Sequence, residues 1–176
     1  MSLKKSRFFA IIGTFALSFL FHFAYELLPN FVFSILFPVN ESIWEHMKII
    51  YSSIIFYGII DYFISKKFHI EYHNFLFNIV FCSFIGILIY LGLFLPLYFK
   101  FGESMIISIG ILFITYIIVY IISYYVLMSE EFDYSYLWVL LIVIGYIIFG
   151  YLTYRPIHNQ LFYDTHHKIY GIKKRN

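Results

Sequence analysis

The chain has 176 residues, of which 62% are hydrophobic and only 12% are charged. A soluble domain carries about 25% charged residues, so this chain cannot cover its apolar surface with polar side chains, and lipid must cover it. The formal net charge of +2, with basic residues in short clusters at segment ends, argues against a nucleic-acid-binding surface. The composition predicts a single-domain, all-α, polytopic membrane protein whose partner is the lipid bilayer.

Five apolar stretches are long enough to cross a hydrocarbon core, which takes about 20 helical residues. We predict helices because an open backbone finds no hydrogen-bond partners in lipid. The predicted spans form a helical bundle within residues 1–154 and cover residues 8–28, 43–65, 74–97, 105–128 and 136–154. Residues 155–176 form a polar tail that also carries apolar and aromatic residues, so we expect it to fold over the helix ends at one face.

The first span carries an ionisable pair in its second half. In the stretch HFAYELL, His22 and Glu26 are four residues apart, which places them on one helix face. His22 lies too deep in the span to be a simple surface residue, and a histidine inside a transmembrane helix is a functional-site candidate. The alternative explanation is a buried hydrogen bond that joins two helices.

The connection after the first span is apolar but too short to cross a membrane. Residues 30–38 include the stretch FVFSILF, which Pro29 and Pro38 flank. Such a segment fits a re-entrant or interfacial element, which is tolerated at membrane depth only when it packs against protein. A hydrophobic turn that lies on the bilayer surface fits the same residues, so both alternatives stay open.

The second span begins with a stretch rich in ionisable residues, PVNESIWEHMK. Ser42 and Glu45 form a capping-box pattern, and Glu45 can pair with Lys48, so helix initiation explains part of this stretch. On a continuous helix, Glu41 and Glu45 share a stripe from which both could hold one ion. His46 lies on another face and needs a second helix to complete a site.

Near the other end of the second span, Asp61 lies shortly before Lys66, and we expect a salt bridge between them or an interfacial position for Asp61. With five spans, the end of the first, the start of the second and the tail emerge on the same face. The sequence therefore predicts one polar pocket there. Its predicted residues are His22, Tyr25, Glu26, Asn40, Glu41, Trp44, Glu45, His46, Lys48 and Asp164.

Three segments, HFAYELL, FPVNESIWEHMK and TYRPIHNQLFYDTHHKIYGI, together resemble a family of small bacterial integral membrane proteins known as a domain of unknown function. The family shares an H-F-x-Y-E stretch, a V-N-E-S-x-W-E-H-x-K stretch and a tail with L-F-x-D followed by Y-G. The matching positions are His22, Phe23, Tyr25, Glu26, Val39, Asn40, Glu41, Ser42, Trp44, Glu45, His46, Lys48, Tyr154, Pro156, Leu161, Phe162, Asp164, Tyr170 and Gly171. Arg155 and Ile157 stand where the family has more proline, so the tail match is looser. The resemblance implies candidate residues and no activity.

Three functions fit these residues. The first is a pocket at one membrane face that binds or transports a small solute, a cation or a lipid head group. The second is an intramembrane hydrolase of a lipid or other amphiphile, with Glu41 as general base and a divalent transition metal such as zinc. Its metal ligands would be His22, Glu26, Glu45 and His46. The third is a structural or partner-binding subunit. We expect a multi-pass protein of the bacterial cytoplasmic membrane that forms a homo-oligomer or binds a membrane partner subunit.

Overall fold

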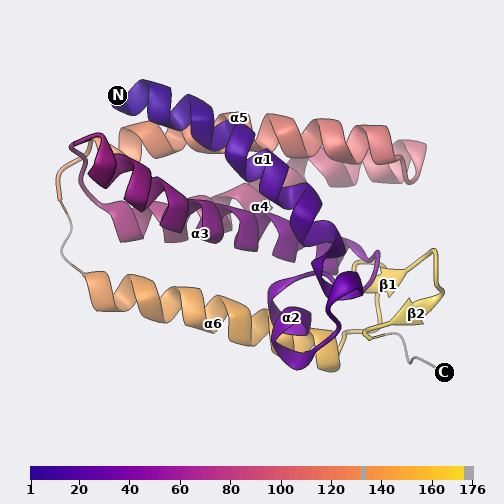
Figure 1. Cartoon of the computed structure of the whole chain (residues 1–176). Helices are drawn as coiled ribbons and strands as arrows, with labels where there is room; N and C mark the ends of the chain where they lie inside the picture. The colour runs from indigo at the N-terminus through magenta and orange to yellow at the C-terminus, as the bar shows by residue number, and fades with distance from the viewer. Residues whose placement is uncertain (132–133, 173–176) are drawn as a thin grey trace.

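The computed structural model describes residues 1–131 and 134–172, so residues 173–176 of the predicted tail lie outside the described residues. Within them the chain forms helices and one antiparallel strand pair (Figure 1). The elements are α1 (Leu3–Leu27), α2 (Phe31–Leu36), α3 (Ile43–Lys67), α4 (Phe75–Phe101), α5 (Met105–Leu127), α6 (Ser135–Tyr154), β1 (Tyr163–Asp164) and β2 (Ile169–Tyr170). Five of the described helices, all except α2, are long and apolar enough to cross a membrane. The prediction of an all-α, polytopic membrane protein is confirmed.

Local capping signals set the helix ends. The side chain of Ser2 caps α1, which therefore begins before the predicted residue 8. Helix α4 continues through Pro96 and stops where Gly102 adopts a positive φ of 77°, a conformation that favours glycine. Ser42 caps α3, so Glu41 lies before the helix rather than on its surface.

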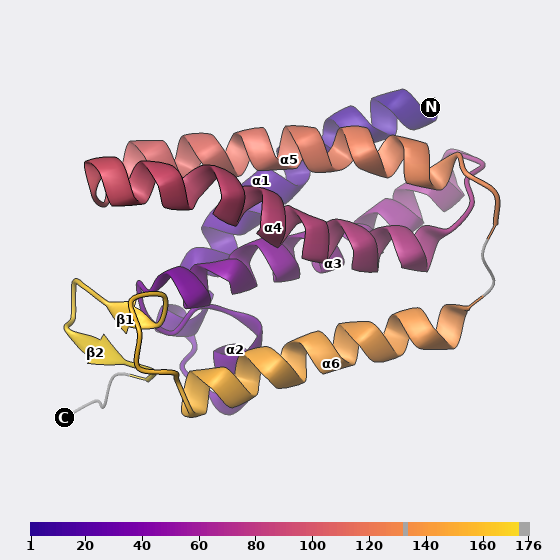
Figure 2. The same ribbon diagram turned by 180° about the vertical axis from the view of Figure 1, so that it is seen from behind.

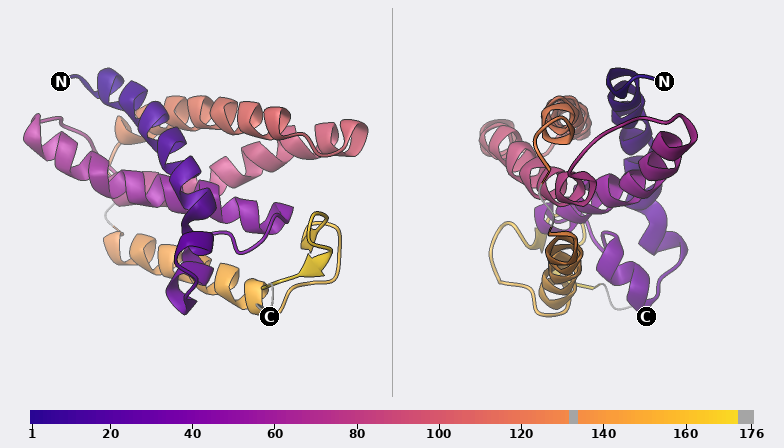
Figure 3. Two further views of the ribbon diagram at one scale, coloured as in Figure 1. Left: turned by 45° about the vertical axis from the view of Figure 1, so that its right-hand side comes forward. Right: turned by 90° about the vertical axis from the view of Figure 1, so that its left-hand side faces the viewer.

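Helix α3 occupies the centre of the bundle. In its most apolar window, 67% of the residues are buried, compared with 17% in α6. Helices α1 and α5 lie on one side of α3 and α4, and α6 lies on the other (Figures 2 and 3). An apolar, largely exposed helix such as α6 is covered by lipid in a membrane.

Buried hydroxyl groups join the spans in the interior. Ser18 of α1 lies 2.6 Å from the hydroxyl of Tyr116 on α5 and donates to Ser53 of α3 at 3.2 Å. The hydroxyl of Tyr51 on α3 donates to the carbonyl of Ile142 on α6 at 3.0 Å. Such bonds contribute to helix association in lipid, where burial of apolar surface supplies little driving force.

Asp61 forms a buried ion pair with Arg7 of α1 and accepts a hydrogen bond from Ser6 at 2.9 Å. The predicted salt bridge between Asp61 and Lys66 is wrong. Five residues along a helix correspond to a rotation of about 140°, so the two side chains face different directions. Asp61 faces α1 and is 2% exposed, whereas Lys66 is exposed.

The segment between α1 and α3 contains α2, a short helix that packs against α6. Asn30 caps its first turn, and its last carbonyls accept hydrogen bonds from side chains of α3. Lys48 donates to the carbonyl of Ser34 at 2.7 Å, and Ser52 donates to that of Leu36 at 2.5 Å. Phe31 is 66% exposed, so α2 is anchored to protein on one side only.

Candidate functional site

Three side chains from three segments meet at one end of the bundle: His22 of α1, Glu41 of the connection between α2 and α3, and His46 of α3. Their ligand atoms lie within 4.8 Å of one another. His46 Nε2 lies 3.4 Å from Glu41 Oε2, and His22 Nε2 lies 3.8 Å from Glu41 Oε1. The side chains are 28%, 36% and 27% exposed in chain order, so an ion can reach them.

The backbone orients the ring of His46. Its Nδ1 lies 2.9 Å from the carbonyl oxygen of Ser42. A carbonyl oxygen only accepts, so Nδ1 carries a proton, and in the neutral ring Nε2 is an acceptor that faces the Glu41 carboxylate. Two acceptors that face each other repel. A proton or a metal ion between them removes that repulsion.

The spacing of the cluster suits a metal ion. Ligand atoms about 2.0–2.1 Å from a tetrahedral zinc ion lie about 3.4 Å from each other. His46 and His22 lie 3.4 Å and 3.8 Å from different oxygens of Glu41, and the three ligand atoms lie within 4.8 Å of one another, so small side-chain movements would bring them to this spacing. Two histidines and one carboxylate are a known ligand set of catalytic zinc, and they leave one position open.

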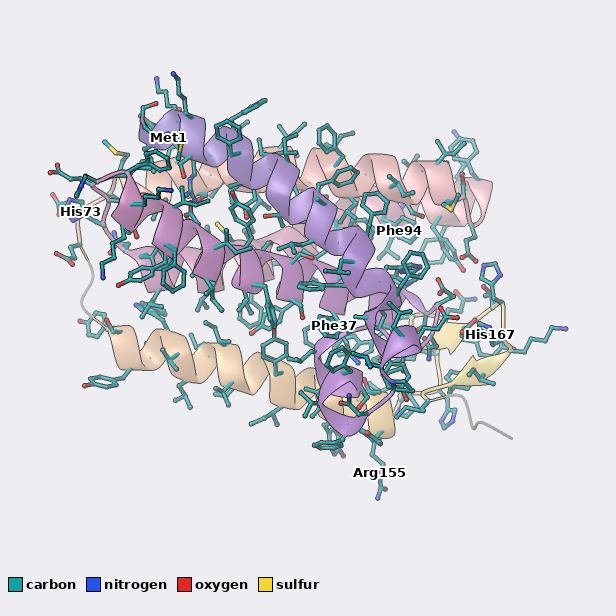
Figure 4. The ribbon with its side chains drawn as sticks, in the orientation of Figure 1. Met1, Phe37, His73, Phe94, Arg155 and His167 are labelled. Carbon is teal, nitrogen blue, oxygen red and sulfur yellow. The ribbon has the colours of Figure 1, made fainter. Side chains whose placement is uncertain are left out.

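Strands β1 and β2 form a C-terminal hairpin, which holds Glu41 in place through Asp164, a fully buried carboxylate. Asp164 accepts hydrogen bonds from the backbone N–H of Glu41 at 3.0 Å and of His167 at 2.8 Å, and the ring of His167 lies 2.9 Å away. Burial alone raises the pKa of Asp164, but these hydrogen bonds outweigh it, so the pKa is lowered below its usual value. Figure 4 shows His167 beside the strands at this end of the molecule.

Glu45 and Lys48 form a buried ion pair, with Lys48 Nζ 2.7 Å from Glu45 Oε2. Thr153 of α6 donates to Glu45 Oε1 at 2.7 Å, and the N–H of Val39 donates to Oε2 at 3.0 Å. Glu41 and Glu45 therefore do not share a helical stripe as expected, because Ser42 caps α3 after Glu41. Glu45 connects α3 to α6 and to the preceding loop.

Four other predicted pocket residues are not ligands of the cluster, and each has its own surroundings. Asn40 donates to the carbonyl of Gly171 at 2.7 Å, which joins the start of α3 to the hairpin. Trp44 stacks on an aromatic ring of the tail at a centroid distance of 4.8 Å. Tyr25 packs against buried aromatic residues of α1 and the loop after α2. Glu26 is exposed near the end of α1, outside the cluster.

A cavity of about 40 Å³ lies beside Glu41 and His46. It exceeds the volume of about 10–15 Å³ that one water molecule needs. Glu103, in the connection between α4 and α5, also lines it and binds the hairpin through Thr165 at 2.9 Å and His166 at 3.1 Å. Glu103 is not among the predicted pocket residues. A lone acid between two apolar spans, on the same face by parity, was the available signal.

Among known protein families, the chain matches one family model. A family model described as "Family of unknown function (DUF6512)" matches residues 1–172. This match confirms the resemblance to an uncharacterised domain family. No curated protein matches the chain. No solved structure matches it either.

Proposed function

Because the chain belongs to the Family of unknown function (DUF6512), we propose its function from the site's own geometry: it binds a divalent transition-metal ion through His22, Glu41 and His46 at one face of the membrane. The observation that carries this proposal is the convergence of three ligand side chains from separate segments on one point. Zinc suits this set of nitrogen and oxygen donors, as do other divalent transition metals.

The surroundings of the cluster favour a metal ion over a hydrogen-bonded cluster. Metal-bound histidines are typically oriented by a backbone carbonyl or carboxylate at the second ring nitrogen, as Ser42 does for His46. Hydrogen bonds between nitrogen and oxygen are usually about 2.7–3.2 Å long, which is shorter than the 3.4 Å and 3.8 Å separations in the cluster. Asp164 fixes the backbone of Glu41, and this reduces the entropy that metal binding must overcome.

A spectroscopic titration tests this proposal. Purified protein in detergent, stripped with a chelator, is titrated with Co²⁺, whose visible absorption reports tetrahedral coordination. We expect saturation at about one ion per chain and a loss of affinity of at least about 100-fold in Glu41→Gln and in His46→Ala. The matched control is His73→Ala, because His73 lies at the opposite end of the bundle from the hairpin (Figure 4). Equal affinity in all four proteins contradicts the proposal.

A second candidate function is metal-dependent hydrolysis of an amphiphile, and the cavity beside the cluster favours it. It has room for a water molecule beside Glu41 and His46, and a zinc ion bound there would lower the pKa of a bound water to about 7. In this proposal Glu41 is a metal ligand rather than a general base, and Glu103 accepts the proton that the bound water loses. Zinc-loaded protein should then cleave a fatty-acid ester, and Glu103→Gln should keep the metal but lose the turnover. Metal binding without turnover favours cation binding or transport.

A further inference from the structure

At the end of the bundle opposite the metal cluster, α1 and α5 enclose a groove of about 300 Å³. Residues of α1 form one wall and tyrosines of α5 form much of the other. Lys4 and Arg7 lie at this groove, and Phe8 and Ile121 continue it along the lipid-facing surface. We propose that the groove binds one anionic phospholipid, with its phosphate beside Lys4 and Arg7 and its upper acyl chains along the apolar part.

The charges at the groove favour an anion. Of the described residues that line it, none is acidic. Asp61 neutralises Arg7, whereas the ammonium group of Lys4 contacts the ring of Tyr124, 5.8 Å from its centroid. Lys4 is exposed and contributes a positive charge at the edge of the first span, where lipid phosphates lie.

Arg7 supplies a second and independent argument. Its side chain is 6% exposed, and its Nε–H has no hydrogen-bond partner among the residues that the structure describes. Asp61 and Ser123 occupy the terminal nitrogens of the guanidinium group. A buried N–H without a hydrogen-bond partner is destabilising, and because Arg7 lines the groove, a phosphate oxygen bound there would supply a good acceptor.

The apolar part of the groove matches the rest of a phospholipid. Phe8 is 61% exposed, Ile121 is 54% exposed and Tyr125 is 68% exposed. Tyrosines are favoured at the level of lipid head groups because they have an apolar ring and a polar hydroxyl. Basic pockets between transmembrane helices are a typical form of lipid head-group site. The groove therefore offers the positive charge of Lys4, an N–H of Arg7 and acyl-chain contacts in the order in which a phospholipid presents them.

Native mass spectrometry of protein released from vesicles of equal phosphatidylglycerol and phosphatidylcholine content tests the proposal. We expect one phosphatidylglycerol adduct on the wild type and about a fivefold weaker adduct on Lys4→Gln. Lys5→Gln is the matched control, because Lys5 is an exposed neighbour that does not line the groove. It should retain the adduct. Ile121→Trp, which fills the groove without changing its charge, should lose it.

Three results would overturn the proposal. One is an equal loss of the adduct in Lys4→Gln and Lys5→Gln, which indicates non-specific attraction to surface charge. Another is equal retention of phosphatidylcholine. The third is a dimer in place of the adduct, which makes a second copy of the chain the occupant. His46→Ala should keep the lipid whether or not the metal proposal holds, because the two sites lie at opposite ends of the bundle.

Discussion

Lys48 has no exposed side-chain surface, yet it carries an ammonium group. That group lies within 2.7 Å of Glu45 and donates to Thr153 at 2.6 Å, to the carbonyl of Ser34 at 2.7 Å and to that of Phe37 at 3.4 Å. These partners belong to α2, α3, α6 and the loop after α2. A buried charge with this many acceptors holds these segments together at the end of the bundle that carries the candidate metal cluster.

Lys48→Met should lower the free energy of unfolding by about 3–5 kcal/mol, because it leaves the Glu45 carboxylate buried without its counter-charge. Denaturant unfolding in mixed micelles measures the loss. The double variant Lys48→Met, Glu45→Gln should lose less than the sum of the two single variants, because neither charge remains. Strictly additive losses would show that the two residues do not stabilise each other.

Asp164 makes stability depend on pH at the acidic end. Because its pKa is lower in the folded protein than in the unfolded chain, it contributes stability above the usual aspartate pKa of about 3.9. That contribution is lost as pH falls through the lowered value. Asp164→Asn should therefore be less stable than the wild type near neutral pH, and the difference should shrink in acid. Unfolding temperatures measured from neutral to acidic pH test this prediction. Glu131→Gln is the control, because the side chain of Glu131 is 71% exposed. A pH-independent difference contradicts the assignment.

At the scale of elements, the hairpin depends on its contacts with α3 and α6. Its strands pair at two positions, Tyr163 with Tyr170 and Asp164 with Ile169, and so short a hairpin is not stable alone. Gly171 follows β2 with a positive φ of 64°, and a Cβ there would lie 2.8 Å from the carbonyl oxygen of Thr153. The close approach of the hairpin to α6 therefore requires glycine.

Gly171→Ala should destabilise the protein by at least about 1–2 kcal/mol, from the left-handed conformation and the contact with Thr153 together. It should also weaken metal binding, because the hairpin carries Asp164, which holds Glu41. Thermal unfolding and the Co²⁺ titration measure the two effects. Gly92→Ala is the control, because a Cβ at Gly92 meets nothing within 4 Å. Equal behaviour of both variants would show that the hairpin does not support the site.

At the scale of the whole molecule, the sequence predicts the five spans and the shared face of α1, α3 and the tail. Apolar length is a strong local signal, and an odd number of spans determines the shared face. The partners inside the site are not predictable in the same way. The prediction that Glu41 and Glu45 share a stripe requires one continuous helix through both residues. In the structure Ser42 caps α3, so the helix begins after Glu41. Glu45 bonds to Thr153, far away in the sequence.

The molecule has two chemically different ends. One end combines His22, Glu41 and His46 with a hairpin that holds Glu41 by its backbone. The other end combines the buried Arg7–Asp61 pair with Lys4 at a lipid-facing groove. Such an arrangement fits the two proposals, a metal site at one face and a lipid site at the other.

Metal content by mass spectrometry tests the central claim most directly. Protein purified in detergent after growth with zinc should contain about one transition-metal ion per chain, both in the wild type and in His73→Ala. The double variant His22→Ala, His46→Ala should contain almost none while it keeps its helical circular dichroism spectrum. Metal retained in full by that folded double variant, or a well-folded wild type that contains none, would contradict the account.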